Sequence, residues 1–267
     1  MRILVSSDWH LDYWSEEPRV PGIIPHLVGL DALILAGDLA DNPRRHWPLY
    51  LAWLGRHIDA AKVFVIPGNH DYYHHRLDGD GELRAVVEAA GMSFVQKRAL
   101  EFGNTRFLCC TLWTDFALFG TPEQSMTDAR WMEDFELIQR SAEGGTVTPS
   151  DTRARHKDHL AWLTRTIRRP HSGRTVIVTH HQPSPAIGGR PSSVSPFFAS
   201  NLDAWILDHR PDLWLCGYAH RRLQARVGST AIRDISFGYP HEVLPQQEAG
   251  LLRRGLIDTD LPDLLAH

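Results

Sequence analysis

The 267-residue sequence predicts an α/β fold on the basis of two repeated patterns. Short apolar runs of three to five residues, rich in Val, Ile and Leu, recur along the chain, and such runs are typical of strands buried on both faces. Segments with apolar residues at near-helical spacing lie between these runs. Because strands that alternate with helices are typical of layered architectures, we expect helices packed on a sheet.

Several segments of the sequence are predicted to be strands. Five apolar runs lead into loops with polar residues, at 3–5, 32–36, 63–66, 175–178 and 213–216. The region 93–114 contains two further apolar segments separated by Gly103-Asn104, which is a hairpin-like signal, and 230–237 is similar to a strand. A hairpin pairs antiparallel strands, so we expect a mixed sheet or two packed sheets instead of a purely parallel sheet.

Helices are expected between these strands. Three segments carry the helical pattern, at 47–58, 81–90 and 156–167. Gly91 follows the second segment, where a glycine in the left-handed conformation commonly ends a helix. Ser200 is a good N-cap for a further helix that runs to about Leu207.

The chain shows no internal repeat and no clear linker, so we expect residues 1–267 to form a single domain. The polar, mixed segment 115–155 is interpreted as a cap or insertion. The segment 182–196 contains four prolines and two adjacent glycines, which favours a loop over the functional site. Substrate specificity is expected to lie in 115–155 and 182–198.

The composition excludes several classes of protein. Hydrophobic residues make up 43% of the chain and charged residues 22%, which is a globular mixture and not a disordered or collagen-like one. The net charge of −4 does not indicate a nucleic-acid-binding surface over the whole protein. Three cysteines without a CxxC motif argue against a disulfide framework and predict a cytoplasmic protein. No run of 18 apolar residues occurs, so no membrane span is expected.

Five loops that follow predicted strands carry residues that bind metals. In chain order these residues are Asp8 and His10, then Asp38 and Asp41, then Asn69, His70 and Asp71, then His180 and His181, and finally His220. The carboxyl ends of strands in an α/β fold converge on one edge, so these side chains are expected to lie together. Carboxylates, imidazoles and an amide oxygen suit Mn, Fe or Zn better than a soft metal.

This set of residues could supply the metal ligands and the proton donor of a two-metal hydrolase. Two cations at such a site need a bridging carboxylate, for which Asp38 is the candidate. Asn69 supplies a neutral ligand, while the neighbouring His70 can give a proton to the leaving group or hold a phosphoryl oxygen. Asp41 lies three residues beyond Asp38 and is the candidate to orient His70.

The motifs together resemble those of the calcineurin-like metallophosphoesterases, over the stretch from Asp8 to His220. They are Asp8-Trp9-His10, Gly37-Asp38-Leu39-Ala40-Asp41, Gly68-Asn69-His70-Asp71, Thr179-His180-His181 and Gly217-Tyr218-Ala219-His220. The resemblance implies a four-layer αββα sandwich of two mixed β-sheets flanked by helices, with the metal site at the carboxyl ends of the strands. Residues 111–116, Thr-Leu-Trp-Thr-Asp-Phe, are similar to a motif of a bacterial branch of the family.

The resemblance also implies a ligand set for one or two divalent metal ions per chain. Manganese and iron are expected, with zinc and magnesium as alternatives. At the first metal the family pattern places Asp8, His10, Asp38 and His220. At the second metal it places Asp38, Asn69 and His180, together with a histidine of a Gly-His-x-His motif. Tyr218 stands where that histidine would be.

Tyr218 leaves three alternatives open. The first is that the second metal binds weakly, because a neutral phenol with an ordinary pKa of about 10 is a poor ligand. Tyr218 can instead bind ferric iron as a phenolate, or turn away so that water or another side chain takes its place. His181 is expected either to contact substrate or to cap its loop. Trp9 and Trp113 are candidates to stack on a nucleobase or an aryl leaving group.

The sequence therefore predicts a metal-dependent phosphoric ester hydrolase, a phosphodiesterase or phosphatase. Its expected substrates are phosphodiesters or small phosphomonoesters, including nucleotides, cleaved by metal-activated hydroxide. The alternative is a catalytically weak member that binds a nucleotide or a partner and has an impaired second metal site. A third hypothesis is hydrolysis of a non-phosphate ester by a single metal.

Overall fold

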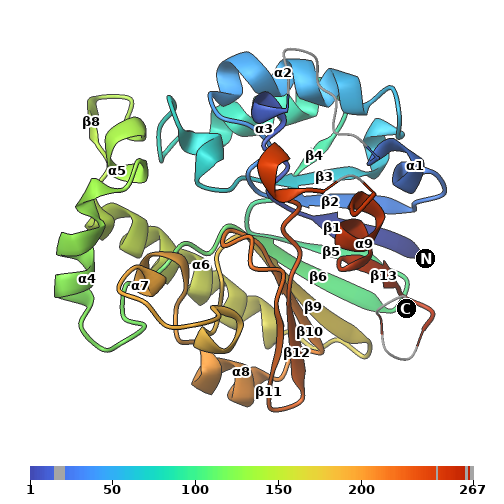
Figure 1. The fold of residues 1–267 in the computed structure, drawn as a ribbon. Coiled ribbons are helices and arrows are strands. Elements are labelled where there is room, and N and C mark those ends of the chain that lie inside the picture. The colour runs from blue at the N-terminus through green and yellow to red at the C-terminus, as the bar shows by residue number, and fades with distance from the viewer. Residues whose placement is uncertain (15–21, 245, 262–263, 265–267) are drawn as a thin grey trace.

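The computed structural model describes residues 1–14, 22–244, 246–261 and 264, and its architecture has four layers. Two β-sheets pack face to face in the middle, and helices cover the outer face of each sheet (Figure 1). The four-layer αββα sandwich that the family resemblance implies is thus confirmed.

The first sheet is mixed, with one antiparallel strand at its edge. Its strands are β1 (Arg2–Ser6), β2 (Ala32–Ala36), β3 (Val63–Ile66), β4 (Ser93–Phe94) and β13 (Leu256–Asp258). They lie in the order β13-β1-β2-β3-β4. Neighbours from β1 to β4 are parallel, and β13 pairs antiparallel with β1.

The second sheet is also mixed, with an antiparallel strand at each edge. Its strands are β5 (Arg98–Phe102), β6 (Thr105–Cys110), β9 (Arg174–Thr179), β10 (Leu213–Cys216), β11 (Gln224–Val227) and β12 (Thr230–Asp234). They lie in the order β11-β12-β10-β9-β6-β5. The predicted hairpin around Gly103-Asn104 is the β5–β6 pair, and the four central strands are parallel.

The helices of the described residues are α1 (Ile24–Leu27), α2 (Pro43–Leu54), α3 (Asp80–Ala89), α4 (Pro122–Asp128), α5 (Asp134–Leu137), α6 (Pro149–Ile167), α7 (Ser195–Phe198), α8 (Asp203–His209) and α9 (Glu248–Arg253). They have four to seven residues, except for α2, α3 and α6, which have 12, 10 and 19. Side chains of α2 and α3 share one core with the outer face of the first sheet, and those of α6 and α8 share another with the outer face of the second. A third core, between the sheets, contains Val5, Ile34, Val176 and Leu215. No helix of the described residues is long and apolar enough to cross a membrane.

The local predictions hold with three corrections. The helix expected at 47–58 is α2, which begins and ends four residues earlier, at Pro43 and Leu54. Gly91 follows α3 with φ of 74°, as expected for a residue that ends a helix. Helix α6 begins seven residues before the expected position 156, because Thr148 and Asp151 form a capping box ahead of it. Ser200 is not a helix cap, since α8 begins at Asp203.

Short elements occupy most of the segment interpreted as a cap. Between Asp115 and α6 lie α4, a 3-10 helix at Ala129–Trp131, α5, and the two-stranded sheet of β7 (Gln139–Ser141) and β8 (Gly144–Thr146). Figure 1 shows this segment in green beside the sandwich. It carries Asp134 and Trp131, which contribute to the site described next.

Candidate metal centre

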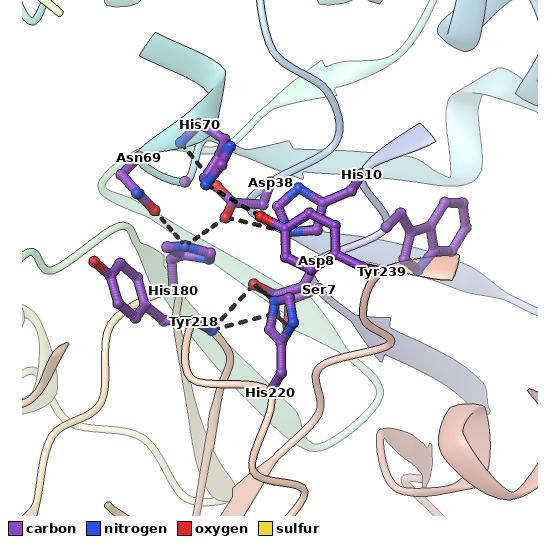
Figure 2. Close-up of polar contacts among 12 residues, drawn as sticks. Ser7, Asp8, His10, Asp38, Asn69, His70, His180, Tyr218, His220 and Tyr239 are labelled. Atoms are coloured by element: carbon purple, nitrogen blue, oxygen red, sulfur yellow. Dashed lines mark hydrogen bonds and ion pairs between the residues drawn. The ribbon is translucent and has the colours of Figure 1, made fainter. Parts of the chain in front are cut away.

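The carboxyl ends of five strands, from both sheets, bring the predicted ligands together (Figure 2). Strands β1, β2 and β3 of the first sheet and β9 and β10 of the second each end just before a motif. Five motif residues adopt positive φ angles of 42–76°, namely Asp8, His10, Asp38, Tyr218 and His220. Such backbone conformations cost about 1–3 kcal/mol each in non-glycine residues and concentrate at functional sites.

Asp8 and His220 form one side of the centre. His220 Nε2 lies 3.1 Å from Asp8 Oδ1, and the Ser7 hydroxyl donates a hydrogen bond to Asp8 Oδ2 at 2.5 Å. Burial alone would raise the pKa of Asp8, but the imidazole of His220 outweighs it and lowers this pKa below its usual value. Burial opposes protonation of His220 as well, yet Asp8 raises the pKa of His220 to about 10. Asp8 is therefore a carboxylate at neutral pH, and a cation bound here would displace the proton of His220.

Asp38 lies between two imidazoles. Its Oδ2 is 3.3 Å from His180 Nε2 and 3.7 Å from His10 Nε2, while its Oδ1 accepts a hydrogen bond from the backbone N–H of His70 at 3.0 Å. Gly68 packs so closely that a Cβ there would collide with Asp38 Oδ1. A carboxylate between two groups of ligands has the position that a bridging ligand needs.

Three groups of potential ligand atoms overlap around these two carboxylates. They are Asp8, His10 and His220; His10, Asp38 and His70; and Asp8, Asp38 and His180, with the atoms of each group within 4.8 Å of one another. The structure thus brings together the predicted ligands of both metals.

The surroundings of His10 indicate that this centre fits a cation. The side chain is buried, and neither ring nitrogen has a hydrogen-bond partner among the described residues. Burial lowers the pKa of His10 to about 3, so the imidazole is neutral and offers a lone pair. Buried polar atoms are nearly always paired, and a metal ion would satisfy this one.

Asn69, the neutral ligand predicted for the second metal, is held by two neighbours. Its Oδ1 lies 3.0 Å from His180 Nε2, and its amide Nδ2 donates to Asp134 Oδ1 at 2.9 Å. The hydroxyl of Tyr73 donates to the same Asp134 oxygen at 2.7 Å. The buried carboxylate of Asp134 therefore turns the oxygen of Asn69 toward the centre.

His70 lies at the edge of the centre and pairs with Asp41, as the sequence predicts. Its Nδ1 is 2.7 Å from Asp41 Oδ1, and its side chain is 12% exposed. Burial would lower the pKa of His70, but Asp38 and Asp41 outweigh it and raise this pKa to about 9. The imidazolium form is thus favoured at neutral pH, with Nε2 free to face a substrate apart from a 3.5 Å contact with the Tyr239 hydroxyl.

Asp71 ties the second and third motif loops together. Its carboxylate accepts hydrogen bonds from the backbone N–H groups of Asp38, Leu39, Ala40 and Gly68 and from the Trp47 indole, at 2.7–3.2 Å. Asp71 is therefore a structural support for the loops and not a ligand.

Tyr218 and His181 lie beside the ligands. The ring of Tyr218 packs against His181 with centroids 4.4 Å apart and against Phe198 at 5.2 Å. Figure 2 shows the Tyr218 hydroxyl pointing away from Asp8 and Asp38. Burial raises the pKa of Tyr218 well above its ordinary value, and nearby carboxylates add to this effect. His181 is buried and belongs to none of the three ligand groups.

Sequence reasoning missed three residues of this site. Glu242 Oε2 lies 2.7 Å from His220 Nδ1, Tyr239 stacks on His10 with centroids 4.1 Å apart, and Asp134 holds Asn69. All three are single residues outside the motifs, so no spacing pattern marks them. The prediction that Trp9 and Trp113 stack on substrate is wrong, because both side chains are buried.

A cavity of about 530 Å³ opens onto the centre. Its polar lining residues include His10, Asp38, Asn69, His70, His220 and Glu242. Its aromatic and apolar lining residues include Tyr73, Trp131, Met132, Phe198 and Tyr218. The cavity is large enough for a small ester to reach the ligands.

Comparisons with known proteins agree with this geometry. The family model described as calcineurin-like phosphoesterase matches residues 1–222. The uncharacterized protein L509 of Acanthamoeba polyphaga mimivirus is 23% identical over an alignment of 278 positions, and the alignment covers 91% of this chain and 93% of that protein.

Two solved structures share the fold at low identity. The phosphopantetheinyl hydrolase PptH from Mycobacterium tuberculosis has a TM-score of 0.67 at 17% identity, with 92% of this chain and 96% of that chain covered. TT1561 of Thermus thermophilus has a TM-score of 0.50 at 14% identity, with 97% and 94% covered. Since the family model matches most of the sequence and the ligand groups converge, the chain belongs to the calcineurin-like phosphoesterase family.

Proposed function

We propose that the protein is a metal-dependent hydrolase of phosphodiesters or small phosphomonoesters, and that residues 1–267 act as one domain. The observation that carries this proposal is the overlap of the three ligand groups around Asp8 and Asp38, at the base of a cavity that His70 also lines. PptH, which shares the fold, is named as a hydrolase, and this supports hydrolytic chemistry on the scaffold.

Asp8, His10, Asp38 and His220 would hold a first cation, and Asp38, Asn69 and His180 a second. Manganese or iron suits these oxygen and nitrogen donors, with zinc and magnesium as alternatives. When bound, the cations supply Lewis acidity that lowers the pKa of a water and neutralises charge on phosphoryl oxygens.

Side chains of the protein would supply the proton for the leaving group and hold the proposed ligands in position. His70, which is protonated at neutral pH, would donate a proton from Nε2 to the departing oxygen. Asp41 holds His70 Nδ1, so that Nε2 faces the cavity. Asp134 and Glu242 hold Asn69 and His220 in the orientations that ligation needs.

A panel of esters tests the proposal. The Mn²⁺-loaded protein should hydrolyse bis(p-nitrophenyl) phosphate or p-nitrophenyl phosphate, and EDTA should abolish the activity. His70→Gln should lower kcat by about 10²–10⁴, while Asp128→Asn, at an exposed position of α4, should retain it. Cleavage of carboxylic esters alone would contradict a phosphoesterase and favour the single-metal ester hydrolase.

A second candidate function is a catalytically weak, nucleotide- or partner-binding protein. The orientation of Tyr218 favours it, because a hydroxyl directed away from Asp38 would leave the second metal with only Asp38, Asn69 and His180 as ligands. Nucleotide binding without turnover across Mn²⁺, Fe²⁺ and Zn²⁺ would support this candidate over the hydrolase.

A further inference from the structure

Part of the cavity lining, next to the proposed ligands, presents aromatic side chains to solvent. Trp131 is 66% exposed although it lines the cavity, and Phe198 and Tyr218 are half-buried beside it. An exposed tryptophan at the mouth of a site is costly to leave in water, and clustered apolar surface of this kind marks binding sites. Metal binding alone does not account for these exposed aromatic side chains.

The aromatic wall, defined here as Trp131, Phe198 and Tyr218, is built from three separate parts of the chain. Trp131 ends a 3-10 helix of the cap segment, Phe198 ends α7, and Tyr218 follows β10. A small core of Phe116, Ala129 and Phe197 supports Phe198, which also packs on Tyr218. Trp131 packs edge-on against Phe197, with ring centroids 6.1 Å apart. The wall is thus preformed, so little conformational entropy is lost when a ligand packs on it.

The charge of the cavity restricts what can lie there. Among the described residues that line it there is no lysine or arginine, and Glu133 is an exposed carboxylate next to Trp131 and Met132. A second phosphate or a carboxylate beside the aromatic side chains would find no lysine or arginine there and would be repelled by Glu133. The cavity thus suits one phosphoryl group, bound at the metal centre, attached to an uncharged flat group.

We propose that the aromatic wall is a subsite for an uncharged aromatic or nucleobase-like group of the phosphoester substrate. This inference rests on the proposed function, because the phosphoryl group must reach the metal centre at the same time. Stacking of a ring on such side chains contributes about tenfold or more to affinity, equivalent to about 1.4 kcal/mol.

Non-hydrolysable phosphonates test the subsite by binding alone. Isothermal titration of the Mn²⁺-loaded protein should give a Kd for phenylphosphonate about tenfold below that for methylphosphonate. Trp131→Ala and Phe198→Ala should each remove most of this difference and leave methylphosphonate binding unchanged. Leu49→Ala, at an exposed position of α2, should keep the full difference. 4-Carboxyphenylphosphonate should bind several-fold more weakly than phenylphosphonate.

The outcomes separate the two proposals. Equal affinity for phenylphosphonate and methylphosphonate would overturn the aromatic subsite, as would a preference that persists in both alanine variants. Tighter binding of the carboxylated compound would overturn the selection against a second anionic group. Failure of both phosphonates to bind would contradict the proposed function itself and the subsite with it.

Discussion

Asp134 accepts a hydrogen bond from the side-chain amide of Asn69 at 2.9 Å, although the two residues are 65 positions apart. The oxygen of the same amide group, Asn69 Oδ1, lies 3.0 Å from His180 Nε2. The cap segment therefore sets the orientation of a proposed metal ligand, in addition to lining the cavity.

The first prediction concerns this contact. Asp134→Leu removes the acceptor and should weaken the binding of Mn²⁺ by about 10–100-fold, whereas Asp134→Asn keeps an oxygen and should lose less. Calorimetric titration of metal into the apo protein measures the effect, with the exposed cap residue Asp128→Ala as the matched control. A lower melting temperature with unchanged metal affinity would show that Asp134 serves stability alone.

The second prediction concerns Glu242, which lies beyond the stretch matched by the family model. Its carboxylate holds His220 Nδ1, so that Nε2 faces Asp8. Glu242→Leu should weaken metal binding by about tenfold, and excess Mn²⁺ should restore hydrolysis. Glu242→Gln, which keeps an acceptor oxygen, should behave nearly as wild type. Activity that is lost in the leucine variant and not restored by any Mn²⁺ concentration would argue against this orienting role.

The third prediction concerns Tyr218. Tyr218→His supplies the imidazole that the family pattern has at this position, and should raise affinity for the second metal by at least about tenfold. Tyr218→Phe should leave the metal content unchanged, because the hydroxyl points away from Asp38. Metal analysis after dialysis at fixed free Mn²⁺ measures both. Loss of metal in the phenylalanine variant would show instead that the phenol is a ligand.

The fourth prediction concerns His159, which is buried in α6 and accepts a hydrogen bond from the Leu112 N–H at 3.1 Å. Burial lowers the pKa of His159 to about 3, while in the unfolded chain it is about 6.5. Below pH 6.5 the unfolded state therefore binds a proton that the folded state does not, so stability falls as the pH is lowered toward 3.

Urea unfolding at pH 7, 6 and 5 measures this contribution. His159→Gln should lose stability at pH 7 but should show a pH slope about 1 kcal/mol per unit shallower than wild type below pH 6. Parallel stability curves for the two proteins would contradict the role of His159.

Much of the fold follows from the sequence, because buried parallel strands need unbroken apolar runs. The runs that end before Asp8, Asp38, Asn69 and His180 are strands in the structure, and their ends place these ligands together. The antiparallel edge strand β13 and the start of α6 lie outside the predicted elements. The first is too short to show a pattern, and the second depends on the cap at Thr148.

The residues that support the ligands could not be predicted in the same way. Asp134, Tyr239 and Glu242 act through contacts between distant parts of the chain, and a lone acidic or aromatic residue carries no periodic signal. The sequence also did not predict which tryptophan lines the cavity. Trp9 and Trp113 stand in or near motifs but are buried, while Trp131 has no motif and faces the cavity.

The central claim is that Asp38 bridges a metal centre that hydrolyses phosphoesters. The most direct test is Mn²⁺-dependent hydrolysis of bis(p-nitrophenyl) phosphate by wild type and Asp38→Asn, with bound metal counted in the same samples. We expect the variant to lose at least about a thousandfold in kcat/KM and to bind fewer metal ions, while Asp128→Asn matches wild type. Equal activity and equal metal content in Asp38→Asn would contradict the account.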